Sequence, residues 1–240
     1  MLHKTRGIAL HTVKFSETSI IARIYTELFG LQSFLIKGSR RKGATIKPGF
    51  FQPLTLLDLT IYHKEKNTLQ SIREVHFSDP YQTIPFDIRK SSMTLFINEL
   101  LYKTIREEEP NPGLFEFIYT SCIQLDRIET VNHFHLMFAI RLTRYLGILP
   151  RQDYSSRKPV FNLREGEFQE SIPDHFYFMD PELSKLFYRF LSETTEAIEK
   201  LRVPLKTRTL LLDKVIQYYQ LHLPGFTGLK SQEILHTVLS

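Results

Sequence analysis

The chain has 240 residues, a formal net charge of +5 and 42% hydrophobic residues, so it can form a packed core, and a disordered chain is excluded. Its single cysteine, Cys122, excludes an intrachain disulfide and a zinc site built from several thiolates. No apolar run reaches the roughly 20 residues of a membrane span, and the first residues lack a signal-peptide core, so we expect a cytoplasmic protein without membrane contact.

The positive charge is concentrated in the first third of the chain. Residues 1–80 hold 12 Lys/Arg and 6 Asp/Glu, whereas residues 81–240 hold 19 Lys/Arg and 20 Asp/Glu. A basic surface confined to one part of a chain indicates a module that binds a polyanion, joined to a part with another role. We therefore predict a first domain over residues 1–80 and a second over 81–240.

The first domain has the pattern of a small all-β fold. Runs rich in β-branched and aromatic residues alternate with short polar turns, and they predict five strands, at about 8–15, 20–26, 31–37, 54–62 and 68–77. Five antiparallel strands in this length close most economically into a barrel of the OB type. The predicted fold class is α+β: an N-terminal five-stranded OB-fold β-barrel followed by an all-helical domain.

A basic loop follows the third predicted strand. It brings five positive charges within eleven residues without any acid, at Lys37, Arg40, Arg41, Lys42 and Lys47. Such a cluster is costly in self-repulsion unless it meets an anion, and nucleic acid is the polyanion that best matches a flexible basic loop. The alternative is a solvated loop that only keeps the protein soluble.

Aromatic residues near this loop are candidates for base stacking. OB folds that bind single strands combine basic grooves with exposed rings. Phe34 lies inside a strand, where core packing is expected. Phe50 and Phe51, between Gly49 and Pro53, fit either a core or a stacking role.

The second domain has helical periodicity. Predicted helices cover about 87–107, 114–128, 132–146, 180–200 and 207–223, and a short last helix is capped by Ser231; residues 151–180 are expected to be an irregular insertion with a hairpin at 160–168. Arg141 and Arg144 are three residues apart and therefore share one side of a helix. They fit either structural salt bridges or a site for an acidic peptide.

Known catalytic motifs are absent from the sequence. It contains neither a glycine-rich phosphate loop ending in Lys-Ser/Thr nor a Gly-x-Ser-x-Gly nucleophile elbow. His133 and His135 are two residues apart and would face different sides of a helix, and Cys122 lies on an apolar stripe. We therefore expect a protein that is not an enzyme and has no cofactor and no metal.

Several stretches together resemble the bacterial RecO family of recombination and repair proteins. They are KTRGIALHTVKFSETSIIARIYTELFGLQSFLIKGSRR, FFQPLTLLDLTIYHKEKNTLQSIREV, RLTRYLGILP and YYQLHLPGFTGLKSQEIL, in the family's order. The resemblance implies an OB fold followed by a helical domain, and a cytoplasmic, nucleoid-associated factor without catalysis. It also implies binding to ssDNA and dsDNA, annealing of complementary strands, contact with the acidic C-terminal tail of single-strand DNA-binding protein, and help, together with RecR, in loading RecA.

The resemblance assigns one part of the DNA face by position. Lys37, Arg40 and Arg41 match the family's basic K-G-x-R turn, and the full predicted DNA-binding set is Lys4, Arg6, Lys37, Arg40, Arg41, Lys42, Lys47, Phe50 and Phe51. Arg141 and Arg144 are our own prediction for a protein partner. Many relatives carry a four-cysteine zinc module after the counterpart of Pro150, but residues 151–168 here contain no cysteine, so packing must hold this region.

Three other functions remain open from the residues alone. The same fold serves RNA-binding or ribosome-associated proteins, which the ribose 2′-hydroxyl would distinguish. A nuclease with unrecognised carboxylates is a second alternative, and a protein-binding scaffold with a merely solvated loop is a third.

Overall fold

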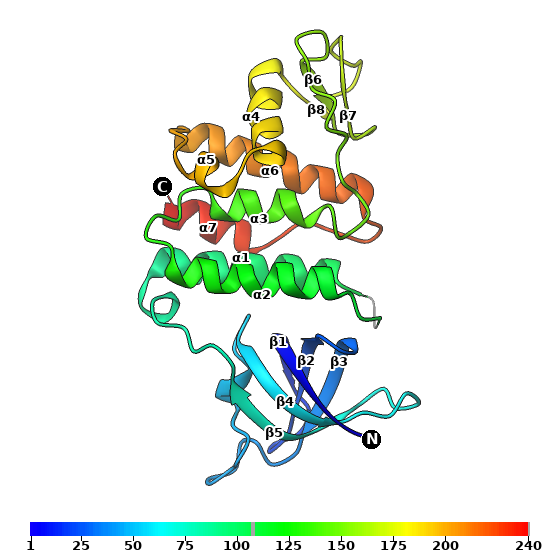
Figure 1. Cartoon of the computed structure of the whole chain (residues 1–240), viewed down its shortest axis with the longest axis vertical. Helices are drawn as coiled ribbons and strands as arrows, with labels where there is room; N and C mark the ends of the chain where they lie inside the picture. The colour runs from blue at the N-terminus through cyan, green and yellow to red at the C-terminus, as the bar shows by residue number, and fades with distance from the viewer. Residues whose placement is uncertain (107–108, 240) are drawn as a thin grey trace. The chain divides into compact units, whose positions relative to one another are not determined.

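The computed structural model describes residues 1–106 and 109–239, which divide into two compact units over residues 1–127 and 128–240 (Figure 1). Among these described residues, no helix is both long and apolar enough to cross a membrane. The first unit contains the predicted sheet and two further helices. The predicted domains, residues 1–80 and residues 81–240, stay a prediction.

The first unit is built on five antiparallel strands, as predicted. Their order in the sheet is β3-β2-β1-β4-β5. Their bounds are β1 Leu2–Lys14, β2 Ile20–Thr26, β3 Gly30–Ile36, β4 Leu56–Tyr62 and β5 Ser71–Phe77.

The predicted closed barrel is corrected to an open sheet whose two edges touch at one point. Only an isolated parallel bridge joins Phe34 of β3 to Gln70, just before β5. It consists of two backbone hydrogen bonds, from Leu35 N to Gln70 O (3.0 Å) and from Gln70 N to Ser33 O (2.8 Å). The Gln70 side chain also donates to the carbonyls of Lys64 and Asn67, so it holds the turn before β5.

The core of the sheet follows the alternation seen in the sequence. The apolar positions of β4, including Leu57, Leu59 and Ile61, point inward, and Phe34 is fully buried as expected. Gly7 allows this packing, because a Cβ there would lie 2.7 Å from Leu59 Cδ1. The strands therefore enclose a continuous apolar core.

Two α-helices and two short 3-10 helices complete the first unit: η1 Pro48–Phe51, η2 Ile84–Phe86, α1 Ile88–Thr104 and α2 Pro112–Arg127. The predicted N-cap of α1 is confirmed, because the Asp87 side chain accepts hydrogen bonds from the backbone N–H of Arg89 and Lys90. The helix ends at Thr104, and the predicted end at Glu107 lies outside the described residues.

A buried polar clamp fastens the linker between the sheet and α1. The Asp126 carboxylate accepts hydrogen bonds from the backbone N–H groups of Gln82, Thr83 and Ile84, each at 2.9 Å. Burial raises the pKa of Asp126, but these bonds outweigh it and hold the pKa below its ordinary value. Lys90, only 4% exposed, donates to Thr83 Oγ1 (2.7 Å) and Asp126 O (2.8 Å). The linker is thus held along its length by the end of α2.

The second unit combines helices with a small three-stranded sheet of order β7-β6-β8. Its elements are α3 Phe134–Leu142, β6 Val160–Asn162, β7 Glu167–Gln169, β8 Phe178–Met179, α4 Pro181–Ser192, α5 Thr195–Glu199, α6 Leu205–His222 and α7 Ser231–Leu239. The predicted hairpin therefore has a third strand, and the insertion is more ordered than expected.

Two predicted helix lengths are wrong. The helix predicted over 132–146 covers only 134–142, because the chain then tightens and Thr143 Oγ1 donates to Ile140 O. The helix predicted over 180–200 starts at the predicted cap, Asp180, but breaks after Ser192. Thr194 caps a new helix there by accepting a bond from Ala197 N, so α5 starts separately.

An aromatic cluster holds the small sheet of the second unit together. Its members are Tyr154, Phe161, Phe168, Phe187, Tyr188 and Tyr218. The ring of Phe161 lies at its centre, fully buried, with ring centroids 4.7 Å from Phe187 and 4.9 Å from Phe168. Packed rings thus stabilise this region. By the resemblance, it is the region in which many relatives carry a zinc module.

The second unit also buries a histidine that should make it sensitive to acid. Burial lowers the pKa of His135 on α3 from 6.5 to about 3, and the nearby Arg208, His133 and His236 add to the effect. The unfolded chain takes up a proton below pH 6.5 that the folded chain does not, so acid favours unfolding. We expect the free energy of unfolding to fall by about 2 kcal/mol between pH 6.5 and pH 5.

Chemical denaturation at the two pH values, on wild-type protein and a His135→Gln variant, measures this effect. The variant should show a flatter pH dependence, whatever its absolute stability. His76→Gln is the matched control, because His76 is exposed on β5. If the free energy of unfolding falls equally in wild type and in the His135 variant between the two pH values, His135 is not the source of the acid sensitivity.

Candidate nucleic-acid interface

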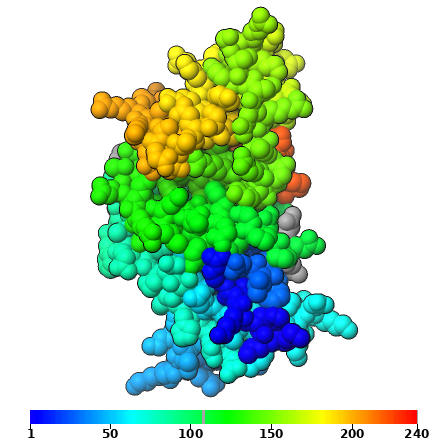
Figure 2. All heavy atoms as spheres, in the orientation of Figure 1, coloured from blue at the N-terminus to red at the C-terminus, as the bar shows by residue number. Residues whose placement is uncertain are grey.

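The basic loop, residues 37–47, leaves the sheet directly after β3 and ends at η1. The side chains of Lys37, Arg40, Arg41, Lys42 and Lys47 are all exposed. None of them forms an ion pair with a carboxylate of a described residue. The loop extends beyond the end of the sheet in Figure 1 and protrudes in the space-filling view of Figure 2. It therefore presents five uncompensated cations to solvent.

Backbone hydrogen bonds give this loop a defined path. Arg40 N donates to Thr18 O in the turn between β1 and β2 (3.2 Å), and Arg41 N donates to Gly38 O (3.0 Å). Gly38 has a φ of +67°, which other residues rarely adopt. Ser39 is buried, and Ile46 packs against the core of the sheet. The uncharged side chains thus anchor the loop while the charged ones point outward.

The structure adds a cation that sequence reasoning missed. Lys14 pairs with Ile20 across the β1–β2 ladder, and Ile20 pairs with Ile36 of β3, so Lys14 lies in the same row as the start of the basic loop. Its side chain is exposed. Strand register is not visible in a sequence, and no local signal distinguished Lys14 from other lysines.

The two predicted stacking residues of the loop have different environments. Phe51 is 3% exposed and belongs to the core, so it offers no face to a base, and we withdraw it from the DNA-binding set. Phe50 is half-buried, and its ring centroid lies 4.6 Å from that of Phe77, a residue of β5 that is 47% exposed. Phe50 and Phe77 form one partly exposed aromatic pair beside the end of the loop.

Lys4 and Arg6 are not part of the surface formed by the basic loop. They lie near the start of β1, whereas Lys14 and the loop lie at its other end, and Lys4 is roughly 30 Å from Lys14 along an extended strand. Lys4 is exposed. Its role in DNA binding stays a prediction.

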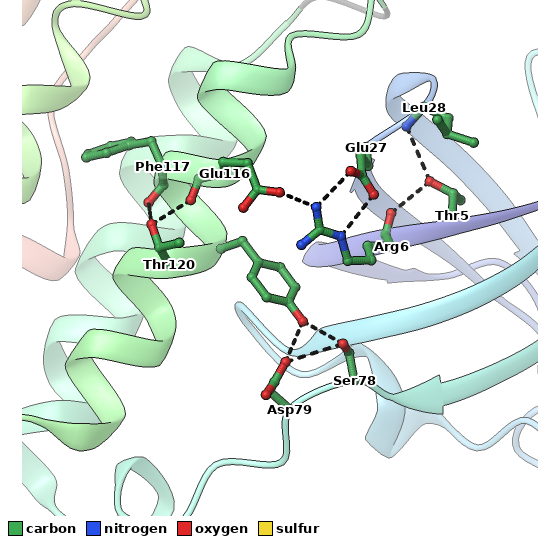
Figure 3. A network of polar contacts seen from close by, with 10 residues as sticks. Thr5, Arg6, Glu27, Leu28, Ser78, Asp79, Glu116, Phe117 and Thr120 are labelled. Atoms are coloured by element: carbon green, nitrogen blue, oxygen red, sulfur yellow. Dashed lines mark hydrogen bonds and ion pairs between the residues drawn. The ribbon is translucent and has the colours of Figure 1, made fainter.

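Arg6 is already held by two carboxylates (Figure 3). Its guanidinium donates to both oxygens of Glu27, at 2.9 and 2.7 Å, and to Glu116 of α2. It also lies over the rings of Phe115 (5.1 Å) and Tyr119 (4.8 Å). The hydrogen bond from Arg6 lowers the pKa of Glu27, and the same bond raises the pKa of Arg6.

This network couples the sheet to α2 inside the first unit. The Tyr119 hydroxyl bonds with Asp79 and Ser78, and burial together with Asp79 raises its pKa to about 12. A cation neutralised by two carboxylates has little charge left for a phosphate. The predicted role of Arg6 in DNA binding stays untested, and its contacts favour a structural role.

Arg141 and Arg144 lie in the second unit and differ from each other. Arg141 is half-buried and donates to Thr195 Oγ1 (2.8 Å) and Glu193 O (3.1 Å), so it holds the junction of α4 and α5. Burial lowers its pKa. Arg144 is exposed beyond the end of α3. Of the two arginines, only Arg144 has an exposed side chain for the predicted partner site.

The described residues show no arrangement that would bind a metal. They contain no group of three or more His, Cys, Asp or Glu side chains positioned around a common point. Cys122 is buried, and burial raises the pKa of its thiol to about 12. It is therefore a poor nucleophile, as its position on an apolar stripe predicted.

Comparison with known proteins gives matches over nearly the whole chain. The family described as Recombination protein O N terminal matches residues 1–81, and the family described as Recombination protein O C terminal matches residues 85–233. A DNA repair protein RecO from Bacteroides fragilis is 35% identical over 237 residues, 98% of each chain. Proteins with the same description from Flavobacterium psychrophilum and Phocaeicola vulgatus are 34% and 33% identical and cover 99% and 100% of each chain.

Proposed function

Because this chain belongs to the RecO family of DNA repair proteins, we propose that it serves recombination and repair by binding DNA through the basic loop and annealing complementary strands. The observation that carries the proposal is the set of five exposed loop cations, none of which is ion-paired with a described residue, joined by Lys14 at the end of β1. The proposed DNA face consists of Lys14, Lys37, Arg40, Arg41, Lys42 and Lys47.

The mechanism of annealing is electrostatic. Lysine and arginine side chains neutralise phosphates on two strands, release their condensed counterions and lower the repulsion between the strands. The five cations are spread over eleven residues of an exposed loop, so one loop can contact the phosphates of two strands. The charges contact phosphates rather than base edges, so ssDNA and dsDNA of any sequence are both ligands.

Protein partners are assigned to the second unit in this proposal. We infer that this unit contacts RecR and the C-terminal tail of single-strand DNA-binding protein, and that the protein thereby helps load RecA onto coated single strands. The support is the family membership and the near-neutral charge of residues 128–240, which have 14 Lys/Arg and 13 Asp/Glu. Arg144 is the exposed cation proposed to hold an acidic tail.

A strand-annealing assay tests the proposed DNA face. Two complementary labelled oligonucleotides are mixed with wild-type protein or with the triple variant Arg40→Glu, Arg41→Glu, Lys42→Glu. The matched control reverses three exposed cations of the second unit, Lys200→Glu, Arg202→Glu and Lys206→Glu, so both variants have the same net charge. Wild type and control should accelerate annealing, and the loop variant should not.

The other outcomes decide between the proposal and its alternatives. Equal annealing by all three proteins would place the DNA contact elsewhere. Equal loss in both variants would mean that net charge matters rather than the loop. Stronger binding to RNA than to DNA of the same sequence would favour an RNA-binding protein, and no binding by wild type would favour a protein scaffold.

A further inference from the structure

An apolar strip lies at the end of β1, beside the basic loop. Val13 and Phe15 are 45% and 57% exposed. Residues two apart on a strand point to the same side, and the hydrogen bond from Phe15 N to Ser19 O continues the ladder by one residue, so these side chains are neighbours on one face. The core of the sheet makes no use of this aromatic ring.

The turn that carries Phe15 is held in a fixed shape. Phe15 N and Ser16 N both donate to Ser19 O, at 3.0 and 3.2 Å, and Ser19 N donates to Ser16 Oγ (3.1 Å). The ring therefore projects from an ordered turn rather than from a mobile end, which lowers the entropy lost when a ligand covers it.

The same turn is attached to the basic loop. Thr18 O accepts the hydrogen bond from Arg40 N, and Lys14 precedes Phe15 directly. Glu17 is the acid of this turn and is exposed to solvent. An exposed ring on a turn that is hydrogen-bonded to the basic loop fits a ligand with an anionic part and a flat apolar part, and a nucleotide of an unpaired strand has both.

We propose that Phe15 is a base-stacking position of this DNA face, used by single strands and not by duplexes. The proposal rests on the function proposed above and adds to it a contact that depends on the bases. In a duplex each base is already stacked between its neighbours, whereas an unpaired base can place its face on the ring. Phosphates on the basic loop and a base on Phe15 then belong to one nucleic-acid strand.

Fluorescence anisotropy with three probes tests this contact in the full-length protein. The probes are a labelled oligothymidylate of about 15 nucleotides, a duplex of equal length, and an abasic oligonucleotide that keeps every phosphate. The variants are Phe15→Ala, Phe15→Tyr and the control Phe86→Ala, which removes a ring that is 88% exposed on η2. Both alanine variants remove exposed rings and should unfold like wild type.

Phe15→Ala should weaken binding of the single strand about 5- to 150-fold and leave the duplex and the abasic strand unchanged. Phe15→Tyr should bind like wild type, and so should Phe86→Ala. Equal losses on the single strand and the abasic strand, or no loss at all, would overturn the stacking contact and leave the ring for a protein partner.

The salt dependence separates this outcome from failure of the DNA face itself. Phe15→Ala should keep the wild-type slope of log affinity against log salt, because the loop cations remain. If wild type binds all three probes without any salt dependence, the proposed DNA face is wrong, and the stacking position is wrong with it.

Discussion

Replacing Arg40, Arg41 and Lys42 by glutamine is expected to weaken binding to single-stranded DNA about 500-fold at 50 mM salt but only about 30-fold at 200 mM. Glutamine keeps the size and polarity of the side chains and removes only the charge. The loss should therefore depend on salt in the way that lost phosphate contacts require. A titration by fluorescence anisotropy at several salt concentrations measures it.

The two numbers follow from counterion release. Each phosphate contact to a single strand contributes about 0.7 to the slope of log affinity against log salt. If the six cations of the proposed DNA face make six contacts, the wild-type slope is about −4.2, and the loss of three contacts reduces it to about −2.1. The variant should thus become less sensitive to salt as well as weaker.

The matched control neutralises Lys200, Arg202 and Lys206, which are exposed in the second unit. It has the same net charge as the loop variant and should keep the wild-type slope. A loop variant that loses affinity by the same factor at every salt concentration would show that the loop acts through its shape and not through its charge.

The second large effect concerns stability. Phe161→Ala is expected to lower the free energy of unfolding by about 3–5 kcal/mol, because it leaves a cavity in the middle of the aromatic cluster. Phe161 is fully buried, and its ring contacts Phe168, Phe187 and Tyr218. The rings around it cannot all close the gap, because β6 and α4 are tied by Ser184, whose hydroxyl accepts a bond from Phe161 N (2.8 Å) and donates to Met179 O (2.9 Å).

Urea unfolding followed by circular dichroism measures this loss. Phe176→Ala is the control, because Phe176 is 90% exposed in the same segment and its removal should change stability by less than about 0.5 kcal/mol. A cost below about 1 kcal/mol for Phe161→Ala would mean that the cluster is loosely packed and that some other feature holds the small sheet.

The sequence was sufficient to predict most of the strands and helices, but it was insufficient to predict how the edges of the five-stranded sheet meet. Alternating apolar residues such as Leu57, Leu59 and Ile61 have a short-range period that marks a strand directly. The contact between the edges of the sheet depends on Gln70 pairing with β3, and a pairing between distant residues has no local signal. The break after Ser192 was missed because a good N-cap, Thr194, can also sit inside a continuous helical pattern.

The candidate site likewise has residues that the sequence could predict and residues that only the structure places there. The five charges of the basic loop lie within eleven consecutive residues, so their clustering needed no structure. Lys14 and Phe15 come next to the loop only through the register of β1, β2 and β3. Arg6 and Phe51 fit the basic and aromatic composition of a DNA face. In the structure, however, Arg6 is hydrogen-bonded to the carboxylates of Glu27 and Glu116, and Phe51 packs in the core of the sheet. Composition cannot distinguish a side chain that is exposed for a ligand from one that is already paired or buried.

The buried clamp at Asp126 limits how this protein can exchange parts with its relatives. The boundary between the two family regions falls between residues 81 and 85, within the linker whose backbone N–H groups Asp126 binds. A chimera joined at this boundary would take its sheet from one parent and the carboxylate at position 126 from the other. Such a hybrid keeps the clamp only if the parent that supplies residue 126 has an acid there and the linker follows the same path. Residues 1–127 should therefore be the smallest segment that can be exchanged between relatives with the clamp intact, in evolution or in protein engineering.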